Sequence, residues 1–200
     1  MNLNESDPDD YDYEAARAEA SASWLEEQVQ FRLKHFYAER PAVFAADGEL
    51  LPEITTWVRR FLAHDAAGML LIGNVGVGKS WSLWKIKETL IKAGFRGGME
   101  IKTGYDLKQL LTPPVNDVAF NDLATVDILA LDDLGSIRVS DWDADHLMGL
   151  LDTRWAFQRP TLVASNNPKL RDLLGERVSS RIQDGAHVVK MIGADRRRSK

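Results

Sequence analysis

The sequence has no cysteine among its 200 residues. Disulfide bonds and thiolate metal sites are therefore excluded, which is compatible with the reducing cytoplasm. It also has no apolar run close to the roughly 20 residues that a membrane helix needs. The first residues are acidic, whereas a signal peptide begins with basic ones. We therefore expect a soluble cytoplasmic protein with no membrane partner.

Positive charge is nearly absent from the first 30 residues, which contain nine acidic side chains and a single basic one, Arg17. This segment carries a net charge of −8, so the rest of the chain carries +3 within the total of −5. An acidic chain does not suit non-specific coating of DNA, but the mildly basic remainder can contact a nucleic-acid backbone locally. Residues 1–13 are polar and acidic, so we expect a disordered tail there.

The remaining chain suits one globular domain with a short extension, because 44% of the residues are hydrophobic. Residues 14–40 are predicted to form an N-terminal helix, which ends before Pro41. It has one apolar stripe formed by Leu25, Val29, Leu33 and Phe36. This stripe either packs on the chain's own domain or docks a partner protein, and the sequence leaves both readings open. Residues 41–200 form the main domain.

Short apolar runs alternate with helical patterns along the main domain, which predicts an α/β fold with a five-stranded parallel sheet flanked by helices. The predicted strands are residues 68–72, 99–103, 126–131, 160–165 and 186–192. The predicted helices are residues 52–64, 81–93, 106–111, 145–157, 170–174 and 176–183. A polar linker is expected between residues 112 and 126.

One stretch between the first strand and its helix fits the phosphate-binding pattern G-x-x-x-x-G-K-[ST] without a mismatch. In this setting backbone N–H groups point at phosphate oxygens, while Lys79 supplies a positive charge and the Ser80 hydroxyl can coordinate Mg²⁺. A glycine-rich turn without function is the alternative. The predicted nucleotide-binding residues are Gly73, Asn74, Val75, Gly76, Val77, Gly78, Lys79, Ser80 and Trp81.

Two later strands end in polar side chains. Residues 126–131 lead into Asp132 and Asp133, and residues 160–165 lead into Asn166. Ligands of parallel sheets bind at the carboxyl ends of the strands. Asp132 is therefore predicted to hold magnesium, Asp133 to orient and deprotonate the attacking water, and Asn166 to hydrogen-bond the γ-phosphate or that water. Asp and Asn are also common turn residues.

With these residues in place, the chain resembles the AAA+ ATPases, and within them the DnaC/IstB group of helicase loaders and transposition helpers. The resemblance covers roughly residues 40–198. It rests on the order of six segments: residues 73–80, 131–135 (LDDLG), 152–155 (DTRW), 160–166 (PTLVASN), 174–182 (LGERVSSRI) and 193–197 (GADRR).

The resemblance implies roles for three further side chains. Asn166 is similar to the sensor-1 residue. Arg181 is similar to the arginine finger, which reaches the nucleotide of a neighbouring subunit, with Arg177 as a second candidate. Arg197 is similar to the sensor-2 arginine, with Arg196 as the alternative.

The function that the resemblance implies is loading of a replicative helicase in a bacterial cell or a phage-infected host. ATP and Mg²⁺ would be bound and hydrolysed, a homo-oligomer would form in the ATP state, and the assembly would hold single-stranded DNA. Lys102, Lys108 and Arg138 are tentative DNA contacts, with ordinary surface charge favoured. Trp142 could stack on a base, although packing is favoured.

Two other functions fit the sequence less well. A transposase helper, or an ATP-dependent binding module with weak hydrolysis, is favoured by Asp133, which stands where family members usually place the longer glutamate. A small-molecule kinase would also use the phosphate loop. Such kinases normally need an arginine-bearing lid, and we find no stretch that predicts one.

Overall fold

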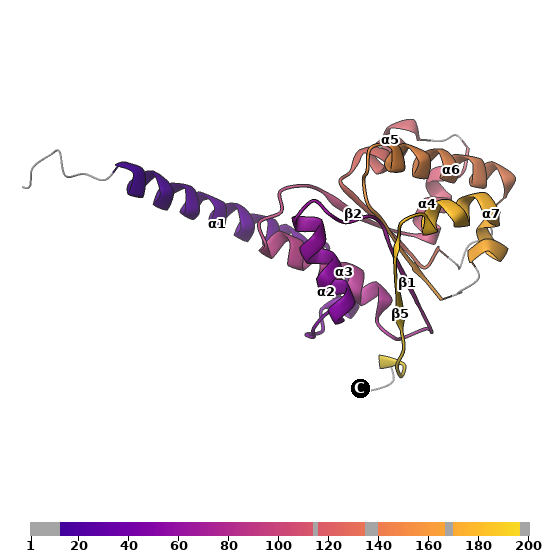
Figure 1. Cartoon of the computed structure of the whole chain (residues 1–200), viewed down its shortest axis with the longest axis horizontal. Helices are drawn as coiled ribbons and strands as arrows, with labels where there is room; N and C mark the ends of the chain where they lie inside the picture. Colours follow the sequence, from indigo (N-terminus) through magenta and orange to yellow (C-terminus); the bar gives the residue numbers. More distant parts are fainter. Residues whose placement is uncertain (1–12, 114–115, 135–139, 167–169, 197–200) are drawn as a thin grey trace, which may run out of the picture. The chain divides into compact units, whose positions relative to one another are not determined.

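The computed structural model describes residues 13–113, 116–134, 140–166 and 170–196 (Figure 1). The expected acidic tail up to residue 12, together with Arg138 and Arg197, lies outside these ranges. The chain divides into two compact units, residues 1–39 and 40–200. The first contains one long helix, α1 (Tyr13–Glu39). Among the described residues, no helix is long and apolar enough to cross a membrane.

The second unit is built on a parallel sheet with the strand order β2-β3-β4-β1-β5. The five strands are β1 (Met69–Gly73), β2 (Met99–Thr103), β3 (Ile128–Asp132), β4 (Thr161–Ser165) and β5 (His187–Met191). Each predicted strand is present. The order places β4 between β3 and β1, so the ends of these three strands lie next to one another.

Side chains of the central strands alternate between two hydrophobic cores, one on each face of the sheet. In β3, Ile128 and Ala130 belong to one core, while Leu129 and Leu131 belong to the other. Helices α2 (Pro52–Leu62) and α3 (Lys79–Lys92) cover the first face (Figure 1). Helices α4 (Gly104–Leu111), α5 (Asp117–Thr125), α6 (Asp141–Ala156) and α7 (Leu170–Gln183) cover the second. Burial on both faces explains why these strands are continuous apolar runs.

Two sequence predictions of helix boundaries were wrong. The polar linker expected before residue 126 contains helix α5, which begins after Asn116, whose side chain accepts a hydrogen bond from the backbone N–H of Ala119. Helix α6 begins at residue 141 rather than 145, because Ser140 and Asp143 form a capping box. The two short segments predicted around Gly175 are present as one kinked helix, α7, with a positive φ of 78° at that glycine.

Arg154 fastens the second face of the sheet, although its place in the apolar pattern of α6 suggested no polar role. The side chain is completely buried. It donates hydrogen bonds to the carbonyls of Leu123, Val126 and Pro160 at 2.7–2.8 Å, and to the Thr161 hydroxyl at 3.0 Å. It therefore ties the end of α5 to the starts of β3 and β4, the strands that carry the candidate site.

Candidate nucleotide-binding site

The phosphate loop, residues 73–80, connects the carboxyl end of β1 to the first turn of α3. Gly76 and Gly78 have φ values of 83° and 102°, a left-handed conformation that side chains disfavour. Lys79 is buried, and its ammonium group donates to the carbonyls of Gly73 and Asn74 at 2.7 and 2.8 Å. The loop thus holds a buried cation at the N-terminus of a helix, which is an arrangement suited to binding phosphate.

Ser80 and Asp132 meet across the boundary between helix and sheet. The Ser80 hydroxyl donates to Asp132 Oδ1 at 3.0 Å, although 52 residues separate them in the sequence. Burial raises the pKa of Asp132, an effect that the hydrogen bond from Ser80 partly offsets. Both groups are oxygen ligands of the kind that Mg²⁺ prefers.

Ser80 and Asp132 fit a magnesium site in which the nucleotide phosphates supply further ligands. Among the described residues, no group of three or more His, Cys, Asp or Glu side chains could hold a metal ion. Mg²⁺ in nucleotide sites usually keeps one or two protein ligands and takes its other oxygens from phosphates and water. Ser80 and Asp132 match that requirement.

Asp133 and Asn166 lie together at the ends of β3 and β4. The Asn166 amide donates to Asp133 Oδ1 at 2.8 Å. Asp133 has a φ of 51°, an unusual conformation for a residue other than glycine. Such strained residues are frequent at functional sites. The structure therefore brings together two polar side chains that the sequence placed only at separate strand ends.

The segment that follows β5 lies against the phosphate loop. The Arg196 backbone N–H donates to the Gly76 carbonyl at 3.0 Å. A Cβ atom on Gly76 would lie 1.8 Å from Asp195 Oδ1, and one on Gly78 would lie 3.6 Å from Arg196 Nη1. Arg196, the alternative to Arg197 for the sensor-2 role, is thus at the loop.

Sequence reasoning overlooked the segment that precedes α2. The Trp81 indole N–H donates to the Ala46 carbonyl at 2.8 Å, and a Cβ atom on Gly48 would lie 3.1 Å from the Trp81 ring. This segment therefore packs on the first turn of α3. A short stretch without helical or strand periodicity carried no pattern that would have indicated this contact.

Arg181 lies at the opposite end of the sheet from the phosphate loop. It lines a cavity of about 60 Å³ together with Gly68 and Thr161, which stand at the amino ends of β1 and β4. Arg177 is 78% exposed in its side chain and only 4.0 Å from Asp145. Arg181 therefore lies away from the chain's own phosphate site.

Two of the three tentative DNA contacts, Lys102 and Lys108, have partners within the chain. Lys102 pairs with Glu100 at 3.1 Å, and Lys108 pairs with the buried Asp143. Trp142 donates its indole N–H to the Leu111 carbonyl at 3.2 Å, so its inner edge packs as favoured, although half of the side chain is exposed.

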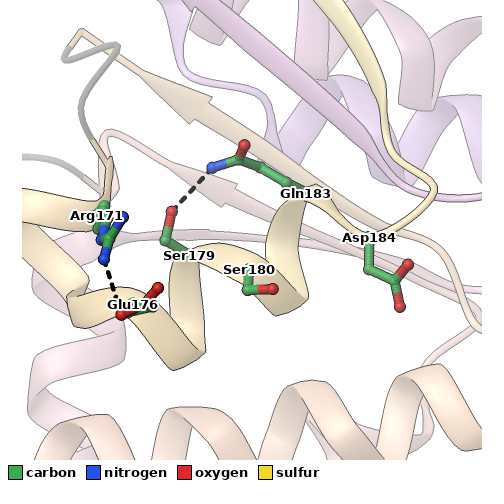
Figure 2. A pocket seen from close by; sticks show the side chains of 6 residues that line it. All are labelled: Arg171, Glu176, Ser179, Ser180, Gln183 and Asp184. Carbon is green, nitrogen blue, oxygen red and sulfur yellow. Dashed lines mark hydrogen bonds and ion pairs between the residues drawn. The ribbon is translucent and has the colours of Figure 1, made fainter.

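A hollow of about 440 Å³ lies along the second half of α7 (Figure 2). Its lining consists of polar and charged side chains: Arg171, Glu176, Ser179, Ser180, Gln183 and Asp184. Figure 2 shows the ion pair between Arg171 and Glu176 and the hydrogen bond from Gln183 to Ser179. Pockets for small molecules are mostly apolar, so this hollow has the character of a wet protein surface.

Curated relatives share part of the sequence, and no protein-family model matches it. The replicative helicase loader DnaI of Bacillus subtilis is 29% identical over 102 residues, which are 50% of this chain and 33% of the relative. The replicative helicase loader DnaC of Escherichia coli K12 is 34% identical over 82 residues, 40% of this chain and 34% of the relative. The matched segment spans about a third of the length of these relatives.

Solved structures share the fold over a larger part of the chain. The crystal structure of DnaI has a TM-score of 0.64 and 23% identity, covering 79% of this chain and 94% of that one. DnaA of Aquifex aeolicus bound to AMPPCP has a TM-score of 0.62 and 20% identity, covering 76% and 50%. The predicted α/β fold with a five-stranded parallel sheet is therefore confirmed, and so is the resemblance of the chain to helicase loaders.

Proposed function

We propose that this chain, whose relatives are replicative helicase loaders, binds and hydrolyses ATP and loads a replicative helicase onto single-stranded DNA. The observation that carries the proposal is a pair of hydrogen bonds next to the phosphate loop. One joins Ser80 to Asp132, and the other joins Asn166 to Asp133. A strand order that brings two polar strand ends beside one phosphate loop suits phosphoryl transfer to water.

Each side chain has a defined task in this proposal. Lys79 places positive charge beside the β- and γ-phosphates, and Ser80 and Asp132 supply oxygen ligands for magnesium, which would neutralise charge on the phosphate oxygens. Asp133 accepts the proton of the attacking water. Asn166 holds that carboxylate in place through the bond at 2.8 Å and would hydrogen-bond the γ-phosphate.

Nucleotide binding is tested with Lys79→Ala, matched by Lys87→Ala on the same helix. The first variant should lose most of its affinity for a fluorescent ATP analogue, because a buried cation at the loop is removed. The control should bind as the wild type does. Equal affinities of all three proteins would contradict a nucleotide site at this loop.

Hydrolysis in an assembly is tested with Arg181→Ala and Arg177→Ala. We propose that Arg181 completes the site of a neighbouring copy, so its removal should lower ATP turnover roughly 1,000-fold in the presence of single-stranded DNA. ATP affinity should not change. Light scattering in ADP and in a non-hydrolysable ATP analogue, with and without oligonucleotide, measures the assembly itself. Absence of both ATP-dependent assembly and DNA-dependent turnover would refute this part of the proposal.

Helicase docking is assigned to residues 14–40. Trp24 and Phe31 stand seven residues apart on α1 and are 49% and 59% exposed, which suits anchoring to a partner. Replacing either with alanine should weaken capture of a replicative helicase, whereas Gln30→Ala should not. Undiminished capture by the Trp24→Ala, Phe31→Ala double variant would place the docking site elsewhere.

A nucleotide-dependent binding module with weak hydrolysis, such as a transposase helper, is the second candidate. It is favoured by the short side chain of Asp133 and its bond to Asn166, which together restrict how far the carboxylate reaches. Asp133→Glu, which adds one methylene, would raise turnover strongly under this reading. A fall in turnover would favour the loader with Asp133 as its working base.

A further inference from the structure

Arg181 is held on three sides by other side chains. Its Nε lies 2.7 Å from Asp152 Oδ1, and its Nη1 donates to Asp184 at 3.4 Å. Its guanidinium carbon lies 4.6 Å from the centre of the Trp155 ring. The side chain is 24% exposed, so a long and flexible residue is fixed at the surface rather than extended into water.

The contact with Asp152 is a close ion pair away from water. Both Nε and Oδ1 are buried, and neither has a hydrogen-bond partner of good geometry. The attraction is therefore mainly between charges, and it is stronger here than at an exposed site because water screens it less. Asp184 is 54% exposed and more distant, so it contributes little.

Asp152 and Trp155, which hold Arg181, both come from the segment DTRW, and this segment supplies no residue to the proposed nucleotide site. Asp152 and Trp155 are three residues apart on α6, so they project from the same face. Arg154 points the other way, into the core, and anchors this end of α6 to the sheet. The face of α6 that holds Arg181 is thus fixed to the sheet by the hydrogen bonds of Arg154.

Trp155 is 57% exposed, and the polar hollow of α7 lies next to Arg181, with Ser180 and Asp184 in its lining (Figure 2). A half-exposed tryptophan under an arginine, beside a wet polar hollow, matches the composition of protein interfaces, where tryptophan and arginine are enriched. Within the described part of the chain, Nη2 of Arg181 has no hydrogen-bond or ion-pair partner, so this nitrogen of the guanidinium can contact a ligand.

We propose that Asp152 and Trp155 are positioning residues that hold the Arg181 guanidinium toward the phosphate oxygens of a nucleotide bound to a second copy of this chain. The inference rests on the proposed function, in which Arg181 acts on a neighbouring copy. Asp152 orients the Arg181 guanidinium through Nε, and the Trp155 ring fixes the plane of that guanidinium. A pre-oriented arginine loses less conformational freedom when it meets the phosphate, and catalysis is sensitive to displacements of order 1 Å.

Three variants of the full chain test the proposal in the presence of ATP and a single-stranded oligonucleotide. Asp152→Asn and Trp155→Leu should each lower kcat roughly 10-fold or more with KM and ATP affinity unchanged. Trp155→Phe keeps an aromatic face and should retain most of the activity. Asp145→Asn, an exposed carboxylate seven residues earlier on α6, is the matched control and should act as the wild type does.

Mixing experiments separate positioning from simple destabilisation. Asp152→Asn copies keep an intact nucleotide site, whereas Lys79→Ala copies keep an intact Arg181. A mixture of the two should regain activity, because each intact site can sit beside an intact finger. Lys79→Ala copies that also carry Asp152→Asn should give no rescue. A purely structural defect in the Asp152→Asn chain would not be repaired by a neighbour.

The outcomes distinguish this inference from the proposed function. Inactive Arg181→Ala together with wild-type rates for Asp152→Asn and Trp155→Leu would overturn the inference alone. Full activity of Arg181→Ala would overturn the role of Arg181 in trans as well. Faster turnover of Asp152→Asn would also overturn the inference, since Asp152 would then restrain the finger instead of positioning it. Thermal melting of each variant identifies a loss of fold.

Discussion

Replacing Arg154 with methionine is expected to remove a large part of the stability of the domain. The guanidinium makes four hydrogen bonds of 3.0 Å or less, three of them to backbone carbonyls. Hydrogen bonds from a charged donor contribute about 1.5–3 kcal/mol each, so the four together contribute about 6–12 kcal/mol. Methionine fills a similar volume and replaces none of them.

The burial of the charge works in the opposite direction. Burial lowers the pKa of Arg154 to about 10, and a fall of this size from 12.5 corresponds to about 3 kcal/mol. The Pro160 carbonyl also keeps a bond from the Leu129 N–H at 3.2 Å. We therefore expect a net loss of about 3–9 kcal/mol, against a total of about 5–15 kcal/mol for a typical domain.

Urea unfolding followed by circular dichroism measures this loss, with linear extrapolation to water. Arg159→Met is the matched control, because Arg159 makes a single hydrogen bond of 3.1 Å to the neighbouring Ala124 carbonyl. Arg159 is only half-buried, so water weakens this bond and the loss should be about 0.5–1.5 kcal/mol. If Arg154→Met lost no more than this control, the role assigned to Arg154 in joining α5, β3 and β4 would be refuted.

Two further substitutions test the loop and a helix cap. Gly76→Ala should weaken ATP binding, and it should lower the stability of the fold by more than Gly94→Ala does. Both glycines have positive φ, but only Gly76 lies against Asp195. Equal stabilities of the two variants in urea would contradict the packing of the C-terminal segment on the loop. Asp143 has a lowered pKa, because hydrogen bonds from Lys108 and Ser140 outweigh the effect of its burial. Its contribution should therefore be present above the pKa of the unfolded chain and be lost as the pH falls through the lower folded value. Asp143→Asn should reduce stability at pH 7 by about 1–2 kcal/mol and much less at pH 2–3; a loss independent of pH would refute the ionic part of this role.

The sequence alone determined the features whose cause is local. A phosphate loop needs glycines at fixed spacing to accommodate positive φ, and Gly76 and Gly78 have it. Strands buried on both faces are apolar throughout, and the runs that form β1 and β3 were predicted on that basis. The missed starts of α5 and α6 also had local signals, namely Asn116, which was placed in a polar linker, and the pair of Ser140 with Asp143, after which the helix was expected to start only at residue 145.

Only the tertiary structure decided which side chains meet. Asp133 and Asn166 are 33 residues apart, and Arg181 meets Asp152 and Trp155 from another helix. Arg154 gathers carbonyls from three elements, although arginine is usually exposed. These contacts follow from the strand order β2-β3-β4-β1-β5, which depends on how the two cores pack across the whole domain. A local pattern shows which face of an element is buried, but it carries no information about which neighbour that face will contact.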